Sequence, residues 1–233
     1  MRKTSNISLC LIVKNEIDGC KKILPLINRK KFGEIFAING FSTDGTKEFL
    51  ISKKIKVYDQ VHKGLNNAYI QANKVSRFEN IVVFFPKGSI NPNSILSFRY
   101  YFDNNYQFIV ASRLLKKSLN EEDHKIIKIR KWSVIILSLF ISLIWRKEGS
   151  IIWDVLHGVK GWKKDLFSKM VINKYGFTID LEMAIQAYKL KVKRIEFPVR
   201  EHPIIGRKTN FPFFKTGFSI LIFLLKEIFT LKK

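Results

Sequence analysis

Short apolar runs alternate with amphipathic segments through the first half of the chain. A strand that is covered on both faces of a sheet has a short, unbroken apolar run as its sequence. Short runs that are mostly apolar occupy residues 7–13, 34–38, 55–58, 80–85 and 106–111. Helical patterns occupy residues 18–29, 46–53, 65–75 and the segment that begins at Asn91-Pro92. This alternation predicts an α/β fold with a doubly wound, mostly parallel sheet.

The second half contains a longer apolar segment. Residues 132–145 carry no charged side chain and have a tryptophan at each end. As a helix this segment would be about 21 Å long, which is shorter than the roughly 30 Å hydrocarbon core of a bilayer. We therefore expect it to lie in a membrane interface, where tryptophan is enriched, and not to cross the membrane. A fully buried core helix is the alternative.

The C-terminal segment, residues 211–231, is rich in Phe, Leu and Ile. Helical spacing places its polar side chains on one narrow face, formed by Lys215, Ser219, Lys226, Thr230 and Lys233. A wide apolar face with a basic edge is typical of a helix that lies on an anionic bilayer. Packing of this helix against the sheet and self-association in a homo-oligomer are the alternatives.

The charge balance narrows the classes of partner. The 233-residue chain has 42 Lys and Arg against 19 Asp and Glu, a formal net charge of +23. Such a charge attracts nucleic acids, acidic lipids or phosphorylated substrates. No helix-turn-helix, RNA-recognition or zinc pattern is visible, so we expect no nucleic-acid partner. The basic residues gather beside the apolar segments, at 125–131, 146–147, 189–194 and 207–208.

Cysteine usage predicts a reducing compartment. Cys10 and Cys20 lack the spacing of a metal site, and both fall in segments predicted to be regular structure. We therefore expect reduced thiols and a location in the cytosol.

Polar, turn-forming residues follow three of the predicted strands. They are Asn15-Glu16, residues 39–46 and residues 86–89. In an open α/β sheet the carboxyl ends of the strands form the edge at which nucleotides bind. The sequence therefore places its candidate binding residues along one edge of the sheet.

An ordered set of motifs resembles the family 2 inverting glycosyltransferases with a GT-A fold, and within them the dolichyl- or polyprenyl-phosphate sugar transferases. Residues 13–16 match the Pro-x-x-Asn-Glu opening without its proline, and residues 39–46 match Asp-x-x-Ser-x-Asp-Gly-Thr. The remaining matches are Gly64 with Ala68, residues 154–161, residues 196–199 and residues 206–209. The resemblance covers nearly the whole chain, roughly residues 6–215.

The resemblance implies roles for particular residues. It implies contacts with the nucleotide sugar for Asn15, Glu16, Asn39, Ser42, Asp44 and Gly64. It places Asp154 near the acceptor, as a base or as a ligand for sugar hydroxyls. Separately from the resemblance, the strong excess of basic residues makes Arg113, Lys160, Arg207 and Lys208 candidates for phosphate or acceptor binding. The family also has an acid facing the sheet near Asp180 and Glu182, and the sequence leaves the choice between these two open.

Two departures from the family pattern affect the expected chemistry. Asn39 stands where the family has an acid, and residues 86–89 read Pro-Lys-Gly-Ser where the family has Asp-x-Asp. Mg²⁺ and Mn²⁺ are typical cofactors of the family, and such hard cations need carboxylate oxygens. We therefore expect no metal and no other cofactor. Lys87 would contact the diphosphate directly as a point charge and serve as a catalytic residue together with Asp154.

The sequence thus predicts a glycosyltransferase that moves a sugar from a nucleotide sugar to a polyprenyl-phosphate or glycolipid acceptor. We expect a GT-A-like domain over residues 1–210, with residues 132–145 inserted, and a membrane-associating helix over residues 211–233. The expected location is the cytoplasmic face of the cell membrane, with peripheral or monotopic attachment. The alternative is a catalytically degenerate homologue that binds a lipid or a partner protein.

Overall fold

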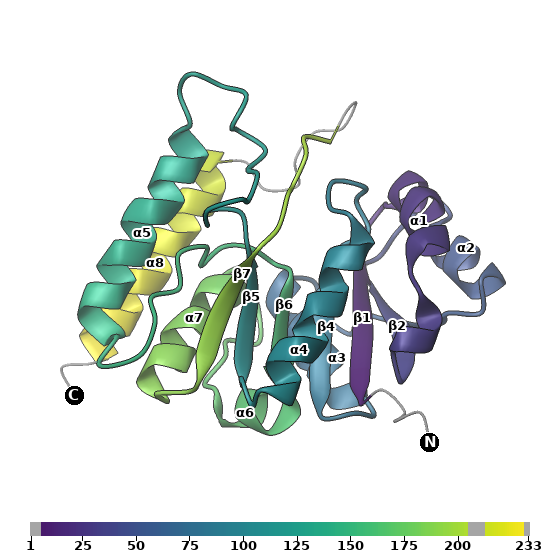
Figure 1. The fold of residues 1–233 in the computed structure, drawn as a ribbon, viewed down its shortest axis with the longest axis horizontal. Helices are drawn as coiled ribbons and strands as arrows, with labels where there is room; N and C mark the ends of the chain where they lie inside the picture. Colours follow the sequence, from purple (N-terminus) through teal and green to yellow (C-terminus); the bar gives the residue numbers. More distant parts are fainter. Residues whose placement is uncertain (1–5, 205–212, 231–233) are drawn as a thin grey trace.

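Seven strands form one sheet in the computed structural model, which describes residues 6–204 and 213–230 (Figure 1). Their order across the sheet is β3-β2-β1-β4-β6-β5-β7. The strands are β1 Ile7–Val13, β2 Glu34–Asn39, β3 Lys56–Asp59, β4 Asn80–Phe84, β5 Phe108–Ser112, β6 Lys160–Lys163 and β7 Arg194–Pro198. Because the chain turns from one side of β1 to the other when it enters β4, the carboxyl ends of β1 and β4 flank a topological switch point.

The sheet is mostly parallel, as the sequence predicts. The pairs β1–β2, β1–β4, β2–β3 and β5–β7 are parallel. Strand β6 runs antiparallel to both of its neighbours, β4 and β5. All residues of β1, β4 and β5 are buried, because helices cover both faces of the sheet. The predicted α/β class is confirmed. The predicted apolar runs did not include β6 or β7, although β7 overlaps the motif match at residues 196–199.

The helices connect and cover these strands. They are α1 Ile17–Ile23, α2 Thr46–Ser52, α3 Leu65–Val75, α4 Ser97–Asp103, α5 Ile129–Trp145, α6 Lys164–Lys169, α7 Ile179–Lys189 and α8 Phe213–Thr230. Three short 3₁₀ helices are η1 Leu24–Leu26, η2 Arg29–Lys31 and η3 Pro92–Leu96. Helix α1 ends six residues before the predicted end, because Pro25 cannot continue the hydrogen-bonded ladder of an α-helix.

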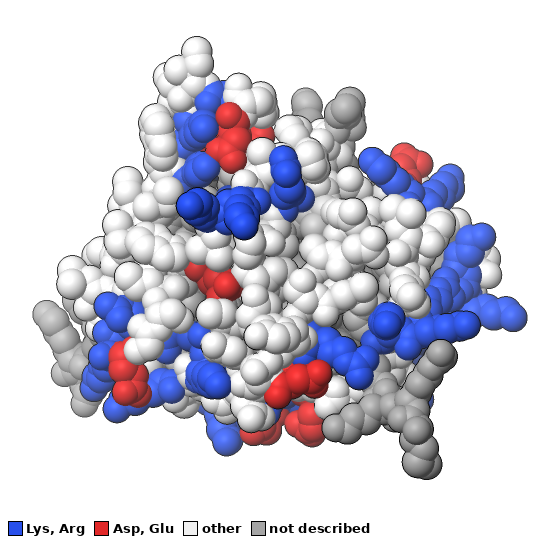
Figure 2. Space-filling model, in the orientation of Figure 1, with Lys and Arg blue, Asp and Glu red and all other residues white. Residues whose placement is uncertain are grey.

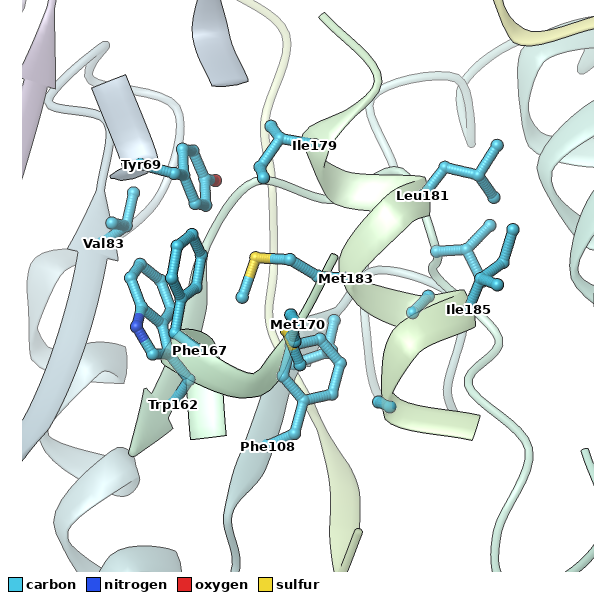
Figure 3. Packing of buried hydrophobic residues seen from close by; sticks show 14 of the residues in the cluster. Tyr69, Val83, Phe108, Trp162, Phe167, Met170, Ile179, Leu181, Met183 and Ile185 are labelled. Carbon is cyan, nitrogen blue, oxygen red and sulfur yellow. The ribbon is translucent and has the colours of Figure 1, made fainter. Parts of the chain in front are cut away.

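Two apolar cores lie on opposite faces of the sheet. Successive residues of β1 alternate between them: Cys10 and Ile12 join one core, while Leu9 and Leu11 join the other. Figure 3 shows part of the first core, in which Tyr69 of α3 stacks on Trp162 of β6 with ring centroids 5.5 Å apart. Side chains of α7 such as Met183 complete this layer.

Helices α5 and α8 each contribute one face to the first core. The buried side chains are Val134, Ile141 and Trp145 of α5 and Phe223 and Leu224 of α8. The opposite faces of both helices are exposed, so the alternative of a fully buried helix over residues 132–145 is wrong. No helix in residues 6–204 or 213–230 is long and apolar enough to cross a bilayer.

Candidate functional site

The loops that follow β1 and β2 are tied to each other by hydrogen bonds. The backbone N–H of Asn15 donates to Ser42 Oγ at 3.0 Å, and the N–H of Thr43 donates to Asn15 Oδ1 at 2.8 Å. Glu16, which is buried, donates its N–H to Thr46 Oγ1 at 2.9 Å. The predicted binding residues Asn15, Glu16 and Ser42 therefore hold two loops in one arrangement at the edge of the sheet.

Asp44 connects the same two loops. Its Oδ2 accepts the N–H of Ile17 at 3.1 Å, and its Oδ1 accepts the N–H of Thr46 at 3.0 Å and the Thr46 hydroxyl. Burial works to raise the pKa of Asp44, but the hydrogen bonds from Thr46 and Ile17 outweigh it and lower the pKa. The carboxylate is thus ionised and stabilises the start of α1 and of α2.

Asn39 lies at the carboxyl end of β2 and contacts an acid on the neighbouring strand. Its Nδ2 donates to Asp59 Oδ1 at 2.8 Å, and Lys47 Nζ lies 2.5 Å from Asp59 Oδ2. The hydrogen bond from Asn39 is the main cause of the lowered pKa of Asp59. Sequence reasoning missed Asp59, although it directly follows the predicted strand 55–58. An acid is therefore present beside Asn39, but β3 supplies it.

Gly64 allows two segments to approach closely. It has a φ of 114°, and a Cβ at this position would lie 2.8 Å from the carbonyl oxygen of Gly176. Both observations require glycine, since other residues rarely adopt this backbone conformation. Gly64 therefore fixes the start of α3 against the loop that precedes α7.

A cavity of about 520 Å³ lies at the carboxyl ends of β4 and β5, with α5 and α8 forming one wall. Its charged lining residues are Lys87, Arg113, Glu121, Arg130, Lys131, Asp154, Asp180 and Glu201. Its apolar lining residues include Leu114, Val134, Leu137, Leu156, Ile220 and Leu224. The lining includes no residue of the loops after β1 and β2, so the structure separates the predicted site residues into two groups.

Arg113 and Asp154 form a buried ion pair at the polar end of this cavity. Arg113 Nε and Nη2 donate to the two Asp154 oxygens at 2.9 and 2.8 Å, and the Arg113 N–H donates to Oδ2 at 2.8 Å. Burial opposes the charge on Asp154, but Arg113 outweighs it and holds the pKa of Asp154 at about 2. Asp154 is therefore a weak base, and its contacts fix the guanidinium of Arg113.

Glu201 joins three loops around the same cavity. Its Oε2 accepts from Arg113 Nη1 at 3.1 Å, and its Oε1 accepts from Ser89 Oγ at 3.0 Å. His157 Nε2 lies 3.7 Å from Glu201 Oε2. Burial and the nearby Arg113 lower the pKa of His157, so its ring is neutral at pH 7. His157 has no ligand-type spacing in the sequence, and Glu201 carries no motif signal.

Lys87 is a cavity cation that lies close enough to Glu201 to help lower the pKa of that carboxyl, but it does not form a direct ion pair with it. Its Nζ lies 5.1 Å from the centroid of the Phe85 ring. Within residues 6–204 and 213–230 it forms no ion pair with a carboxylate, whereas Arg113 pairs with Asp154 and Lys131 pairs with Asp123. Lys87 is therefore available to an anion that enters the cavity.

Lys160 does not reach the cavity. It is 0% exposed, and its amine donates to Asp180 Oδ1 at 2.7 Å and to the carbonyl oxygens of Asp180 and Val155. Burial lowers the pKa of Lys160, and the pairing with Asp180 opposes this shift. Because its three donors are occupied, this geometry does not offer Lys160 to a ligand phosphate, contrary to expectation. It holds the carboxylate of Asp180 in the cavity wall instead.

The structure distinguishes Asp180 from Glu182. Asp180 lines the cavity, whereas Glu182 accepts hydrogen bonds from Asn66 Nδ2 and from the N–H of Asn173, both at 2.8 Å. Thr178 also donates its hydroxyl to Glu182. Glu182 therefore supports the loop before α7, and Asp180 is the acid that a ligand would meet.

The remaining predicted residues, Arg207 and Lys208, lie outside the residues that the structure describes. Two other cations, Arg130 and Lys131, line the cavity from the start of α5. The sequence showed them as part of the basic cluster at 125–131 but did not assign them to the site. Lys131 Nζ lies 2.6 Å from Asp123, and Arg130 Nη1 lies 3.8 Å from Glu121.

No protein-family model and no curated protein matches this chain. Solved structures of glucosyl-3-phosphoglycerate synthase from Mycobacterium tuberculosis are similar to it. The complex with Mn²⁺, UDP and phosphoglyceric acid has a TM-score of 0.66 at 15% identity, covering 91% of this chain and 73% of that chain. The complex with UDP has a TM-score of 0.65 at 15% identity, covering 91% and 74%. A third structure of that synthase has a TM-score of 0.63 at 14% identity, covering 91% and 75%.

These structures correct the expectation about metals. Some of them hold Mn²⁺ together with UDP or UDP-glucose, which contradicts the expectation that no metal takes part. In the part of this chain that the structure describes, no group of three or more His, Cys, Asp and Glu is arranged to hold a metal ion. The roles discussed below are therefore those of the described side chains themselves. The shared feature is the fold: this chain has the α/β architecture of the GT-A glycosyltransferases.

Proposed function

We propose that this protein is an inverting glycosyltransferase that moves a sugar from a nucleotide sugar to a lipid phosphate, such as polyprenyl phosphate, or to a glycolipid. One observation carries the proposal: the cavity beside the switch point combines a charged end with an apolar wall formed by α5 and α8. A ligand with an anionic head and a hydrocarbon chain matches both ends of such a cavity.

The donor would lie at the carboxyl edge of the sheet. The similar synthase structures contain UDP and UDP-glucose, and nucleotides bind at this edge in open α/β folds. Asp59 presents an exposed carboxylate at the end of β3, held by the buried amide of Asn39, where it suits hydrogen bonds to a base or a ribose. Lys87 would supply a positive charge for the diphosphate.

The acceptor phosphate would lie near Arg113, with Arg130 and Lys131 at the same cavity. A phosphate monoester is already an anion at neutral pH, so it needs positioning by cations more than activation by a strong base. The low pKa of Asp154, about 2, agrees with this requirement, since Asp154 is a weak base that holds Arg113. Asp180 would accept hydrogen bonds from sugar hydroxyls.

A thermal-shift panel tests the donor half of the proposal. The panel contains UDP-, GDP- and CMP-sugars with Mn²⁺ present. A ligand at 100 times its Kd should raise Tm by about 5 to 10 °C for a chain of this size. Stabilisation by one nucleotide class would name the donor. If no nucleotide or nucleotide sugar shifts Tm, the proposed function is wrong.

A transfer assay tests the acceptor half. The stabilising donor is offered with a short-chain prenyl phosphate or with 3-phosphoglycerate, which appears in the similar synthase structures as phosphoglyceric acid. The proposal expects the prenyl phosphate to be glycosylated and the phosphoglycerate to be a poor acceptor. Glycosylation of phosphoglycerate alone would contradict the lipid acceptor while keeping the transferase.

One observation favours a second function, a binding subunit without catalysis. The loop after β4 has no carboxylate, and Asp154 and Asp180 are paired with Arg113 and Lys160. Such a protein would bind the prenyl phosphate or the nucleotide but give neither transfer nor donor hydrolysis. The two assays together separate this outcome from the transferase.

A further inference from the structure

The exposed face of α5 is almost entirely apolar, and that of α8 is mostly apolar, with Ser219, Lys226 and Thr230 as its exposed polar residues. Leu143 of α5 is 86% exposed and Phe229 of α8 is 65% exposed. We call these faces together the docking face; it comprises Trp132, Ile136, Leu139, Phe140 and Leu143 of α5 and Phe218, Leu221, Ile222, Leu225 and Phe229 of α8. Large contiguous apolar surfaces on a soluble protein mark sites of interaction.

Two of the three serines of α5 lie on its buried face, although a polar side chain is normally found on the face toward solvent. Ser138 and Ser142 are buried: Ser138 donates its hydroxyl to the Ile152 carbonyl, and Ser142 Oγ accepts from Arg146 Nε at 3.0 Å. Among the exposed positions from 132 to 144 only Ser133 is polar, and its hydroxyl donates to Ile129 O within the helix. A helix that packs on a core and faces water has the reverse pattern.

The charged residues around the docking face indicate which kind of partner it can bind. Lys125, Lys128, Arg130 and Lys131 lie at or just before the start of α5, where they pair with Glu121, Glu122 and Asp123, so these four cations face three acids. Arg146 and Lys147 follow the end of α5. On the side where Figure 1 places α5 and α8, Figure 2 shows a white surface with blue groups, and red groups among them, toward its upper and lower ends. A second copy of this chain would carry the same +23 charge and the same basic surroundings, which repel each other. A partner with both hydrocarbon and negative charge matches the face better.

We propose that the docking face binds an anionic lipid bilayer, with α5 and α8 lying in its interface and not crossing it. Trp132 is half-exposed near one end of the face, and tryptophan favours this depth of a membrane. The surrounding lysines and arginines add attraction to acidic headgroups. Two contacts fix which side of α8 is exposed. Lys189 of α7 pairs with Glu227 of α8 at 2.6 Å, and Phe223 of α8 is buried in the core.

The docking face is continuous with the cavity. Leu221 is exposed on the face and also lines the cavity, while Val134, Leu137, Ile220 and Leu224 line it from the same two helices. A bilayer held on the face would therefore lie beside the apolar wall of the cavity. The docking inference goes beyond the proposed function, because it needs no sugar transfer and no nucleotide.

Vesicle co-sedimentation tests the proposal. The full chain is mixed with vesicles of pure phosphatidylcholine or of equal parts phosphatidylcholine and phosphatidylglycerol. The test variant combines Leu143→Glu with Phe229→Glu. A matched control variant, Val171→Glu, changes a residue that is 78% exposed and lies outside the face. We expect binding to the anionic vesicles by the wild type and the control, and at least tenfold weaker binding by the test variant.

Three outcomes would overturn the proposal. In the first, the wild type fails to bind anionic vesicles. In the second, the test variant binds them as well as the control does. In the third, light scattering shows that the wild type is a dimer and the test variant a monomer, and neither binds vesicles. Circular dichroism and Tm check that all variants fold. If a nucleotide raises the Tm of all variants equally, the substitutions in the docking face leave nucleotide binding intact. The result of the vesicle test is then independent of the proposed function.

Discussion

The two groups of predicted site residues differ in how their polar side chains are used. After β1 and β2, the polar side chains bond to backbone groups of loops that are about 30 residues apart, and both loops belong to motifs in the first 46 residues. At the cavity, Arg113, Asp154 and Glu201 come from segments separated by 41 and 88 positions. The first group is a pre-formed edge that is held by neutral and charge-assisted hydrogen bonds. The second is a buried cluster of charges, which costs more to disturb.

The largest effect is expected when the buried cluster loses its cation. Arg113→Ala leaves Asp154 buried without its partner and should cost about 3 to 5 kcal/mol of unfolding free energy. Urea denaturation measures this loss. The control is Lys47→Ala, which breaks the exposed pair with Asp59 and should cost far less, because solvent screens that pair. Equal losses in both variants would remove the distinction between the two regions.

The next largest effect depends on pH and arises at Glu196, whose carboxylate accepts a hydrogen bond from the backbone of the cavity residue Asp154. Burial raises the pKa of Glu196 from 4.5 to about 7, although its oxygens accept the N–H groups of Trp153 and Asp154 at 2.8 Å. The native state therefore binds this proton more tightly than the unfolded chain does. Its contribution to stability is complete below pH 4.5 and is lost as the pH rises to about 7, by up to about 3 kcal/mol.

Denaturation of the wild type and of Glu196→Gln across this pH range isolates that contribution. His157, whose pKa is lowered by burial, adds the opposite slope to both proteins and cancels in the difference. The wild type should lose more stability than the variant between pH 4.5 and 7. Parallel curves would show that Glu196 titrates normally.

A smaller effect is expected at Lys87, the cavity cation for which the described residues provide no ion pair. Lys87→Ala removes no ion pair among the described residues, so it should change stability by less than about 0.5 kcal/mol. It should weaken the binding of UDP or of a prenyl phosphate by roughly tenfold, or about 1.4 kcal/mol. Isothermal titration measures both ligands. Lys22→Ala removes the same charge beside the same loop but outside the cavity, and should leave both affinities unchanged.

The smallest effect is expected in the pre-formed edge. Asp44→Ala frees the N–H groups of Ile17 and Thr46, which water can reach in part, and should cost about 1 kcal/mol. Thermal denaturation would detect this as a Tm lowered by about 2 to 4 °C. A loss as large as that of Arg113→Ala would mean that the edge and the cavity are equally sensitive.

The difference between the sheet edge and the cavity also explains which parts of the fold and of the site the sequence could predict. Local signals were sufficient for the β-strand pattern of the first half, because β1, β2 and β4 are short apolar runs followed by turn residues. They were insufficient for β6, whose four residues, Lys-Gly-Trp-Lys, have no strand pattern and pair only because β4 and β5 lie on either side. Tertiary context decides such a strand.

The same limit applies to individual site residues. Arg113 and Asp154 were expected near the acceptor, but only the fold reveals that they neutralise each other. Lys160 was expected to contact phosphate because it is basic and lies in a motif, yet its side chain turns into the core toward Asp180. Glu201 and His157 gave no signal, since their partners lie on distant loops.

The decisive measurement is sugar transfer to a short prenyl phosphate, made with the donor that the thermal-shift panel identifies and with Mn²⁺ present. A glycosylated lipid phosphate is expected with the wild type and with Lys22→Ala, and a markedly lower yield with Lys87→Ala. If no donor gives either transfer or hydrolysis, the cavity beside β4 and β5 does not belong to a glycosyltransferase.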